Sequence, residues 1–205
     1  MAGLTTLAPR LAADEALRRL LEGNDRFVAQ ELRHPNRGEE LRLRLAEGQH
    51  PFAVIVGCAD SRVPPELLFD EGLGDLFVIR NAGNVVDATA LASVEYGVAF
   101  LGVALVMVLG HESCGVVTAA VKIDHDHQDV PGHLGTLIAA VRPALEQVGN
   151  GGDDLIDRTV VAHIGVQVAR LRAADPILSR AVQAGTVRVV GARYDLDRGR
   201  VELVA

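Results

Sequence analysis

Two short apolar runs, each followed directly by a polar cluster, constrain the fold of this 205-residue chain more than any other feature. Residues 52–56 read FAVIV, and residues 103–109 read VALVMVL. Runs of this length, rich in β-branched side chains and without polar alternation, are typical of strands buried on both faces. Because ligands bind beyond the carboxyl ends of strands in open α/β sheets, the polar residues after each run are candidates for a functional site.

The remaining periodicity predicts strands that alternate with helices. Strands are expected at 52–57, 76–80, 103–109, 187–190 and 200–204. Helices are expected at 12–31, 38–47, 64–69, 89–101 (capped by Thr89), 115–122, 134–148, 153–173 and 176–184. The pattern predicts an α/β fold. Its central sheet is mainly parallel, with about four strands and an antiparallel C-terminal edge strand, and it carries flanking helices and an N-terminal helical arm.

Length and composition limit the classes of protein that fit. Without an internal repeat or a low-complexity linker, a single domain over residues 1–205 is predicted, with residues 1–48 as the arm. A formal charge of −7 argues against a nucleic-acid partner. Residues 96–110 are almost all apolar, but Glu95 precedes this stretch and Gly102 divides it. We therefore expect a buried helix followed by a buried strand, and no membrane association. Residues 1–12 lack a secretion signal, which favours the cytoplasm.

The only two cysteines follow the two apolar runs, and a histidine precedes the second. Cys58, His111 and Cys114 are the kind of set that holds zinc with a fourth position open. There are two alternatives. The cysteines could be reduced core residues with an unrelated histidine nearby, or Cys58 and Cys114 could form a disulfide. Asp60 and Arg62 favour the metal site, because core packing poorly explains a carboxylate and a guanidinium beside a thiol.

Three stretches resemble a known family, the β-class carbonic anhydrases of bacterial type. They are CADSRVPPELLFDEGLGDLFVIRNAGN at 58–84, SVEYGV at 93–98 and LGHESCGVV at 109–117. The spacing Cys-x-Asp-x-Arg followed by His-x-x-Cys is highly specific. The resemblance implies reversible hydration of carbon dioxide to bicarbonate and a proton by a homodimer or dimer of dimers, in which residues 1–48 pack on a partner subunit.

The resemblance also assigns roles to single residues. One Zn²⁺ per chain would be held by Cys58, His111 and Cys114, with hydroxide as the nucleophile. Asp60 would orient that nucleophile while paired with Arg62, or rotate to become the fourth ligand. The substrate pocket would be lined by Gln49, Phe77 and Tyr96, partly from the partner subunit. Independently of the resemblance, Gly115 is a candidate substrate-binding residue, because it opens a predicted helix whose N-terminus points at the metal cluster.

Several alternatives stay open at this stage. The same family fold would serve a hydrolase of carbon disulfide or carbonyl sulfide, or a catalytically silent zinc-binding relative, although the intact Asp60 and Arg62 argue against the latter. No GxGxxG follows a strand, so a nucleotide site is disfavoured. His125, His127 and His133 lie in the polar loop at 124–133. They could act as a proton shuttle, or they could simply be solvated loop residues. An inhibitory bicarbonate site would need Arg80 and Tyr194, but Ile55 replaces its tryptophan.

Overall fold

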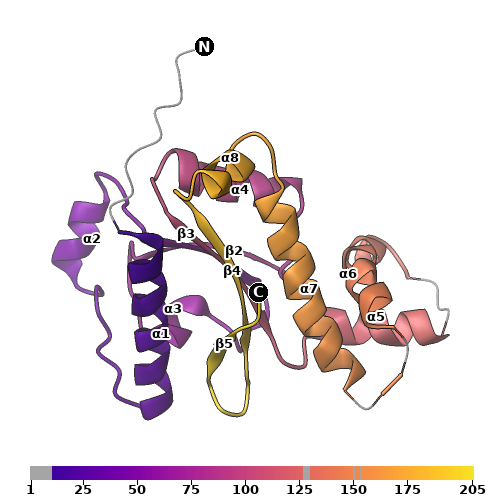
Figure 1. Ribbon diagram of the computed structural model, residues 1–205. Helices are drawn as coiled ribbons and strands as arrows, with labels where there is room; N and C mark the ends of the chain where they lie inside the picture. The colour runs from indigo at the N-terminus through magenta and orange to yellow at the C-terminus, as the bar shows by residue number, and fades with distance from the viewer. Residues whose placement is uncertain (1–10, 127–129, 150, 153) are drawn as a thin grey trace.

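The computed structural model describes residues 11–126, 130–149, 151–152 and 154–205, which form a five-stranded sheet in the order β2-β1-β3-β4-β5 (Figure 1). The strands are β1 (Ala53–Cys58), β2 (Leu76–Asn81), β3 (Leu105–His111), β4 (Arg188–Tyr194) and β5 (Val201–Leu203). The first four pair in parallel, and β5 runs antiparallel to β4. The predicted α/β class with an antiparallel C-terminal edge strand is therefore confirmed.

The two apolar runs occupy the middle of this sheet. Every residue of β1 and of β3 is buried, whereas β2, at the edge, is mostly half-buried. A strand that is paired on both sides and covered on both faces has no solvent side, so its sequence shows no polar alternation. Because β1 and β3 are parallel neighbours, their carboxyl ends meet at one edge of the sheet.

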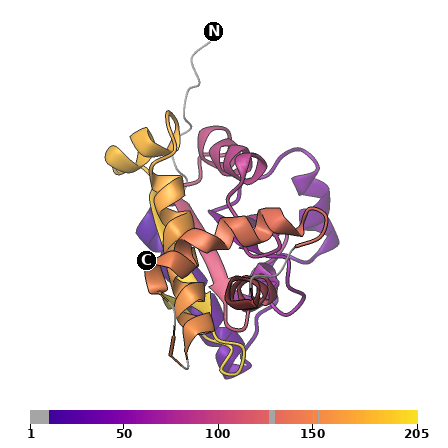
Figure 2. The same cartoon turned by 90° about the vertical axis from the view of Figure 1, so that its right-hand side faces the viewer.

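The helices pack on the sheet and against one another. They are α1 (Ala13–Ala29), α2 (Glu39–Leu45), α3 (Pro65–Leu68), α4 (Ala88–Ala99), α5 (Gly115–Asp126), α6 (Leu134–Val148), α7 (Leu155–Arg172) and α8 (Leu178–Gln183). Helix α7 packs on β3 and β4, and α5 and α6 pack beside α7, away from α1 (Figures 1 and 2). The helix that follows β3 therefore begins at the sheet edge where the two polar clusters lie.

Three local predictions need correction. Helix α4 begins at Ala88, and its cap is Asp87, whose carboxylate accepts a hydrogen bond of 2.7 Å from the Ala90 N–H, not Thr89. Helix α5 runs to Asp126, so the first residues of the predicted loop at 124–133 are helical. Strand β4 extends to Tyr194 because its last residues pair with the end of β3.

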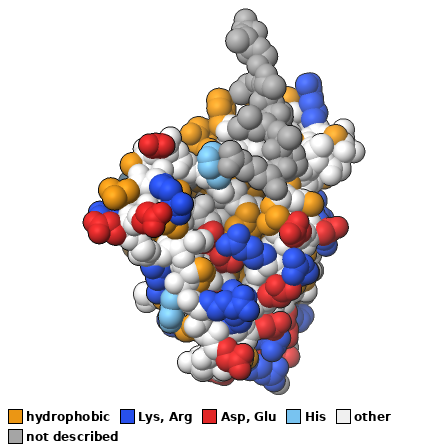
Figure 3. All heavy atoms as spheres, turned by 90° about the vertical axis from the view of Figure 1, so that its left-hand side faces the viewer, with side chains coloured by type: hydrophobic (Ala, Val, Ile, Leu, Met, Phe, Trp, Pro, Cys, Tyr) orange, Lys and Arg blue, Asp and Glu red, His pale blue; other side chains and the backbone are white. Residues whose placement is uncertain are grey.

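Helix α1, part of the predicted N-terminal arm, packs on its own chain. Helix α1 contacts α3 and β3, and Gly23 fits against the chain so closely that a Cβ would lie 1.8 Å from the Phe69 carbonyl oxygen. Arg19 donates to Glu71 at 2.9 Å and to Asp75 at 2.8 Å. The outer face near α1 and α2 carries interleaved acidic and basic side chains (Figure 3). Packing of residues 1–48 on a partner subunit stays a prediction.

Within the described residues, no helix combines the length and the apolar character that crossing a membrane requires. The apolar stretch at 96–110 is divided between the end of α4, a turn and most of β3, as the sequence predicts. The turn is possible because Gly102 adopts a positive φ of 70°, which favours glycine.

Candidate metal centre

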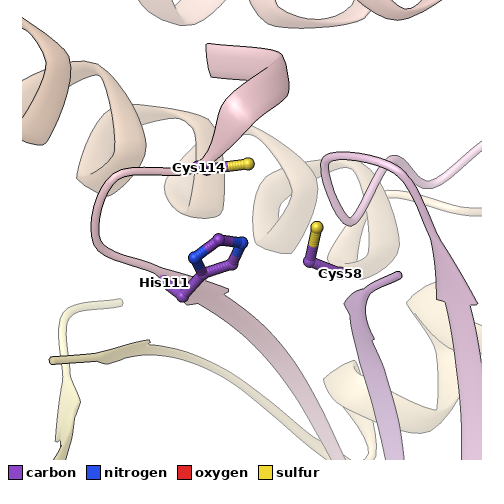
Figure 4. A group of neighbouring side chains, drawn as sticks. All are labelled: Cys58, His111 and Cys114. Carbon is purple, nitrogen blue, oxygen red and sulfur yellow. The ribbon is translucent and has the colours of Figure 1, made fainter. Parts of the chain in front are cut away.

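The carboxyl ends of β1 and β3 bring three potential metal ligands together. Cys58 is the last residue of β1, His111 is the last residue of β3, and Cys114 directly precedes α5. Their ligand atoms all lie within 4.8 Å of one another, and the three side chains are buried and point toward a common centre (Figure 4). The spacing His-x-x-Cys works because a short turn with Ser113 at φ 51° folds Cys114 back over the strand end.

The histidine offers a free nitrogen to this centre. His111 Nδ1 lies 2.8 Å from the Glu112 carbonyl oxygen, which only accepts, so Nδ1 carries the ring proton. Nε2 is then a lone pair, and it is buried without a hydrogen-bond partner among the described residues. A buried polar atom is rarely left unpaired. One imidazole nitrogen and two sulfurs form a set that suits zinc and leaves a fourth position open, so the residues fit the ion.

Both cysteines are free, so the disulfide alternative is not what the structure has. Cys58 Sγ accepts hydrogen bonds of 3.4 Å from the backbone N–H groups of Asp60 and Gly83. A hydrogen bond from the Cys114 thiol, with smaller contributions from these two backbone N–H groups, lowers the pKa of Cys58 despite burial. The same contact, together with burial, raises the pKa of Cys114. The site therefore stabilises negative charge on Cys58.

An ion pair flanks the three ligands. Arg62 donates from Nε to Asp60 Oδ1 at 2.9 Å and from Nη2 to Oδ2 at 2.7 Å, and its backbone N–H donates to Oδ1 at 3.0 Å. The guanidinium holds the pKa of Asp60 well below its usual range. Asp60 Oδ2 lies 3.8 Å from His111 Nε2. Of the two arrangements predicted for Asp60, the structure has the one paired with Arg62.

Arg80 supports the loop that carries Cys58 and Asp60, a role that sequence reasoning missed. Its guanidinium donates to the Cys58 carbonyl at 2.8 Å and to the Asp60 carbonyl at 2.6 Å. The signal was its register opposite Gly57 on the neighbouring strand, which a sequence does not display. The other residues matched to an inhibitory bicarbonate site are fully or almost fully buried, with Ile55 inside β1 and Tyr194 at the end of β4.

The predicted pocket residues divide into two groups. Gly115 opens α5 directly after Cys114, with open space where a Cβ would lie. Gln49 precedes β1, exposed beside a cavity of about 550 Å³ that Leu73 also lines. Tyr96 is 46% exposed on α4, with its ring centroid 6.0 Å from that of Phe77.

Within one chain the structure does not bring Gln49, Phe77 and Tyr96 to the ligands. Phe77 pairs with Val54, near the start of β1, whereas Cys58 ends that strand. At roughly 3.3 Å per residue, Val54 and Cys58 lie about 13 Å apart along the strand.

The histidines considered for a proton shuttle do not gather at the ligands. His127 and the side chain of His125 lie outside the described residues. His133 is exposed and directly precedes α6. A different histidine, His163, is buried beside the site, and the sequence analysis gave it no role.

Several known proteins are similar to this chain in sequence and in fold. A family model described as carbonic anhydrase matches residues 53–201. Carbonic anhydrase 2 of Mycobacterium tuberculosis is 43% identical over 188 residues, which cover 92% of this chain and 91% of that protein. The carbonic anhydrase of Mycolicibacterium smegmatis is 41% identical over 188 residues, with the same coverage. The solved structure of the β-carbonic anhydrase CafA of Aspergillus fumigatus matches with a TM-score of 0.72 at 29% identity, covering 91% of this chain and 89% of that one.

The resemblance stated from the three sequence stretches is thus confirmed over most of the chain. The residues that the family model matches include the strands that carry Cys58 and His111. Both mycobacterial relatives are named as carbonic anhydrases. The chain belongs to the β-carbonic anhydrase family and is an enzyme of the carbonic anhydrase type.

Proposed function

We propose that this chain is a zinc enzyme that reversibly hydrates carbon dioxide to bicarbonate and a proton. The observation that carries the proposal is the Cys58–His111–Cys114 group with the Asp60–Arg62 pair beside it, Asp60 Oδ2 being 3.8 Å from His111 Nε2. A purely structural metal site closes its fourth position with another ligand, whereas these three leave it open. Family membership supports the same reaction.

The residues divide the work of the reaction. Zinc, when bound, supplies hydroxide near neutral pH. Asp60 accepts a hydrogen bond from the nucleophile and so directs a lone pair toward carbon dioxide. Arg62 keeps Asp60 ionised and fixed through its bidentate contact. The amide groups that begin α5 at Gly115 form the positive end of a helix dipole, which favours the negative charge that develops on bicarbonate.

We also propose that the working enzyme is a homodimer or a dimer of dimers. Gln49, Phe77 and Tyr96 line the substrate pocket only if a second subunit supplies them. The exposed aromatic side chains near β2 support an interface there: Tyr96 stacks on Phe100 with centroids 5.2 Å apart, and Phe100 is 54% exposed. Large exposed aromatic residues in one patch mark association surfaces. We place the enzyme in the cytoplasm, where both ligand thiols stay reduced.

Stopped-flow carbon dioxide hydration on metal-analysed protein tests the function. We expect one zinc per chain and activity that disappears with chelation and returns with zinc. Hydrolysis of carbonyl sulfide and carbon disulfide is measured on the same sample. A zinc-loaded protein that hydrates no carbon dioxide would contradict the proposal, and hydrolysis of either sulfur compound in that sample would assign the alternative activity.

A further inference from the structure

A loop between β2 and α4 donates one of the two backbone hydrogen bonds that Cys58 Sγ receives from the described residues. The donor is the Gly83 N–H at 3.4 Å, and the other donor is the Asp60 N–H, which belongs to the cysteine's own loop. Gly83 has a φ of 77°, and a Cβ there would lie 3.0 Å from Val116. The position therefore favours glycine, because other residues rarely adopt this φ and a Cβ would crowd Val116.

Two buried polar side chains of α7 hold this loop in place. His163 Nε2 lies 2.8 Å from the Gly83 carbonyl oxygen, and Gln167 Oε1 accepts a 2.8 Å hydrogen bond from the Val86 N–H. His163 and Gln167 are one helical turn apart and only 1% and 2% exposed. The Gln167 amide nitrogen lies 3.5 Å from His163 Nδ1, so the two side chains also meet each other.

The hydrogen bonds of this pair are consistent in direction. The Gly83 carbonyl only accepts, so His163 Nε2 carries the proton and Nδ1 is a lone pair that accepts from the Gln167 amide. Burial lowers the pKa of His163, which keeps the ring neutral. Other buried positions of α7, such as Val160, Ile164 and Val168, are apolar, and buried Thr159 satisfies its hydroxyl within the helix by donating to the Leu155 carbonyl. Two polar side chains placed there need another reason.

We propose that His163 and Gln167 are positioning residues for the metal site, which hold the Gly83 N–H on the Cys58 sulfur and so reduce the charge that this sulfur donates to a bound metal. The inference rests on the proposed function, in which Cys58 is a metal ligand. Two thiolates neutralise most of the charge of a divalent ion, and an N–H group on one sulfur partly restores it. A more electron-poor metal acidifies its water more strongly, so the pair would shift activity toward lower pH.

The test compares four proteins: wild type, His163→Leu, His163→Gln and Val168→Ala. His163→Leu removes the donor, and His163→Gln offers an amide nitrogen to the Gly83 carbonyl instead. Val168→Ala creates a small cavity on the same helix but leaves the hydrogen bonds in place. The readouts are the sulfur-to-metal charge-transfer absorption of the cobalt-substituted protein, the Gly83 and Asp60 amide proton shifts of the zinc protein, and the activity–pH profile of the zinc protein.

We expect His163→Leu to move the charge-transfer band to longer wavelength and the Gly83 amide proton upfield, while the Asp60 amide stays unchanged. The midpoint of the activity–pH profile should rise, because a sulfur that donates more charge leaves the metal less able to acidify its water. His163→Gln and Val168→Ala should keep wild-type spectra. An unshifted band and Gly83 amide in His163→Leu, or equal shifts in Val168→Ala, would overturn the proposal.

Two further measurements keep the test decisive. If His163→Leu does not fold, wild type loaded with an NMR-active cadmium isotope should show coupling between cadmium and the Gly83 amide proton, and a missing coupling would overturn the inference. The spectra do not depend on turnover. A protein that binds cobalt through Cys58 but hydrates no carbon dioxide therefore contradicts the proposed function, while its spectra still decide the role of the His163–Gln167 pair.

Discussion

The two ends of β1 differ in how completely one chain builds them. At its carboxyl end, the metal end, Cys58 meets His111 and Cys114 within 4.8 Å, with Asp60 and Arg62 beside them. At its amino end, the aromatic end, Phe77, Tyr96 and Phe100 form a cluster that remains partly exposed.

Parallel neighbouring strands explain the difference. They carry their carboxyl ends to one edge, so residues far apart in sequence meet there without help from another chain. Nothing in this topology carries the aromatic end to the same edge. We therefore expect a monomer to keep the metal end intact but to lack a complete substrate pocket.

The largest effect should follow removal of a sulfur ligand. Cys58→Ser and Cys114→Ser should each lose zinc, and carbon dioxide hydration should fall by more than about 100-fold, because a hydroxyl is a far poorer zinc ligand than a thiolate. Metal analysis and stopped-flow assays check this, with Ser61→Ala in the same loop as the control. Full zinc retention in both serine variants would show that Cys58 and Cys114 are not zinc ligands.

The next effect separates orientation from metal binding. Asp60→Asn should retain zinc but lose roughly 100- to 10,000-fold in kcat/KM, because the amide cannot accept as the carboxylate does. Arg62→Lys should cost less, since one point charge replaces the bidentate contact seen in the structure. Zinc content and kcat/KM are measured for both. Loss of zinc from Asp60→Asn would instead make Asp60 a ligand in the resting enzyme.

A charge at the aromatic end should break the assembly without touching the metal end. Phe100→Glu is tolerable in the monomer because Phe100 is 54% exposed, but it should weaken association roughly 30-fold. Sedimentation should show 21.8 kDa monomers that retain zinc and lose activity on dilution. Leu134→Glu, 55% exposed on α6, is the matched control. A wild-type protein that is fully active as a monomer would refute the pocket assignment of Gln49, Phe77 and Tyr96.

The smallest expected change is a movement of Asp60 with pH. Arg62 holds the pKa of Asp60 below its usual range, so the carboxylate stays ionised from mildly acid to alkaline pH and its competitor at the metal decides its position. At about pH 9 hydroxide should occupy the fourth metal position, and Asp60 should stay paired with Arg62. At about pH 6 the competitor is water, a weaker ligand, so the Asp60 carboxylate should take that position and give an inactive form.

Crystal structures at the two pH values, with a matching rate profile, test this movement. The displacement required is small, because Asp60 Oδ2 already lies 3.8 Å from His111 Nε2. The same Asp60–Arg62 pair in both structures would rule the movement out. Replacing Arg62 by lysine should favour the inactive form at both pH values.

Much of the fold followed from local pattern alone. Unbroken apolar runs predicted β1 and β3 because a strand buried on both faces needs no polar residues. The errors lie at element ends. Asp87 rather than Thr89 caps α4, since both residues are good caps and only the chain's path decides which one meets the free N–H groups. Gly23 has a low helix propensity, but in α1 it allows close contact with Phe69.

The sequence by itself determined the ligand set and its chemistry. Cys58, His111 and Cys114 end or follow predicted strands, and residue type and spacing are local properties that a sequence displays. Only the tertiary structure decided which partners surround them. Arg80 reaches the cysteine loop from the neighbouring strand, and His163 lies 80 residues beyond Gly83, on a helix that packs across the sheet. Such contacts depend on how helices and strands pack, and no periodicity in the chain records them.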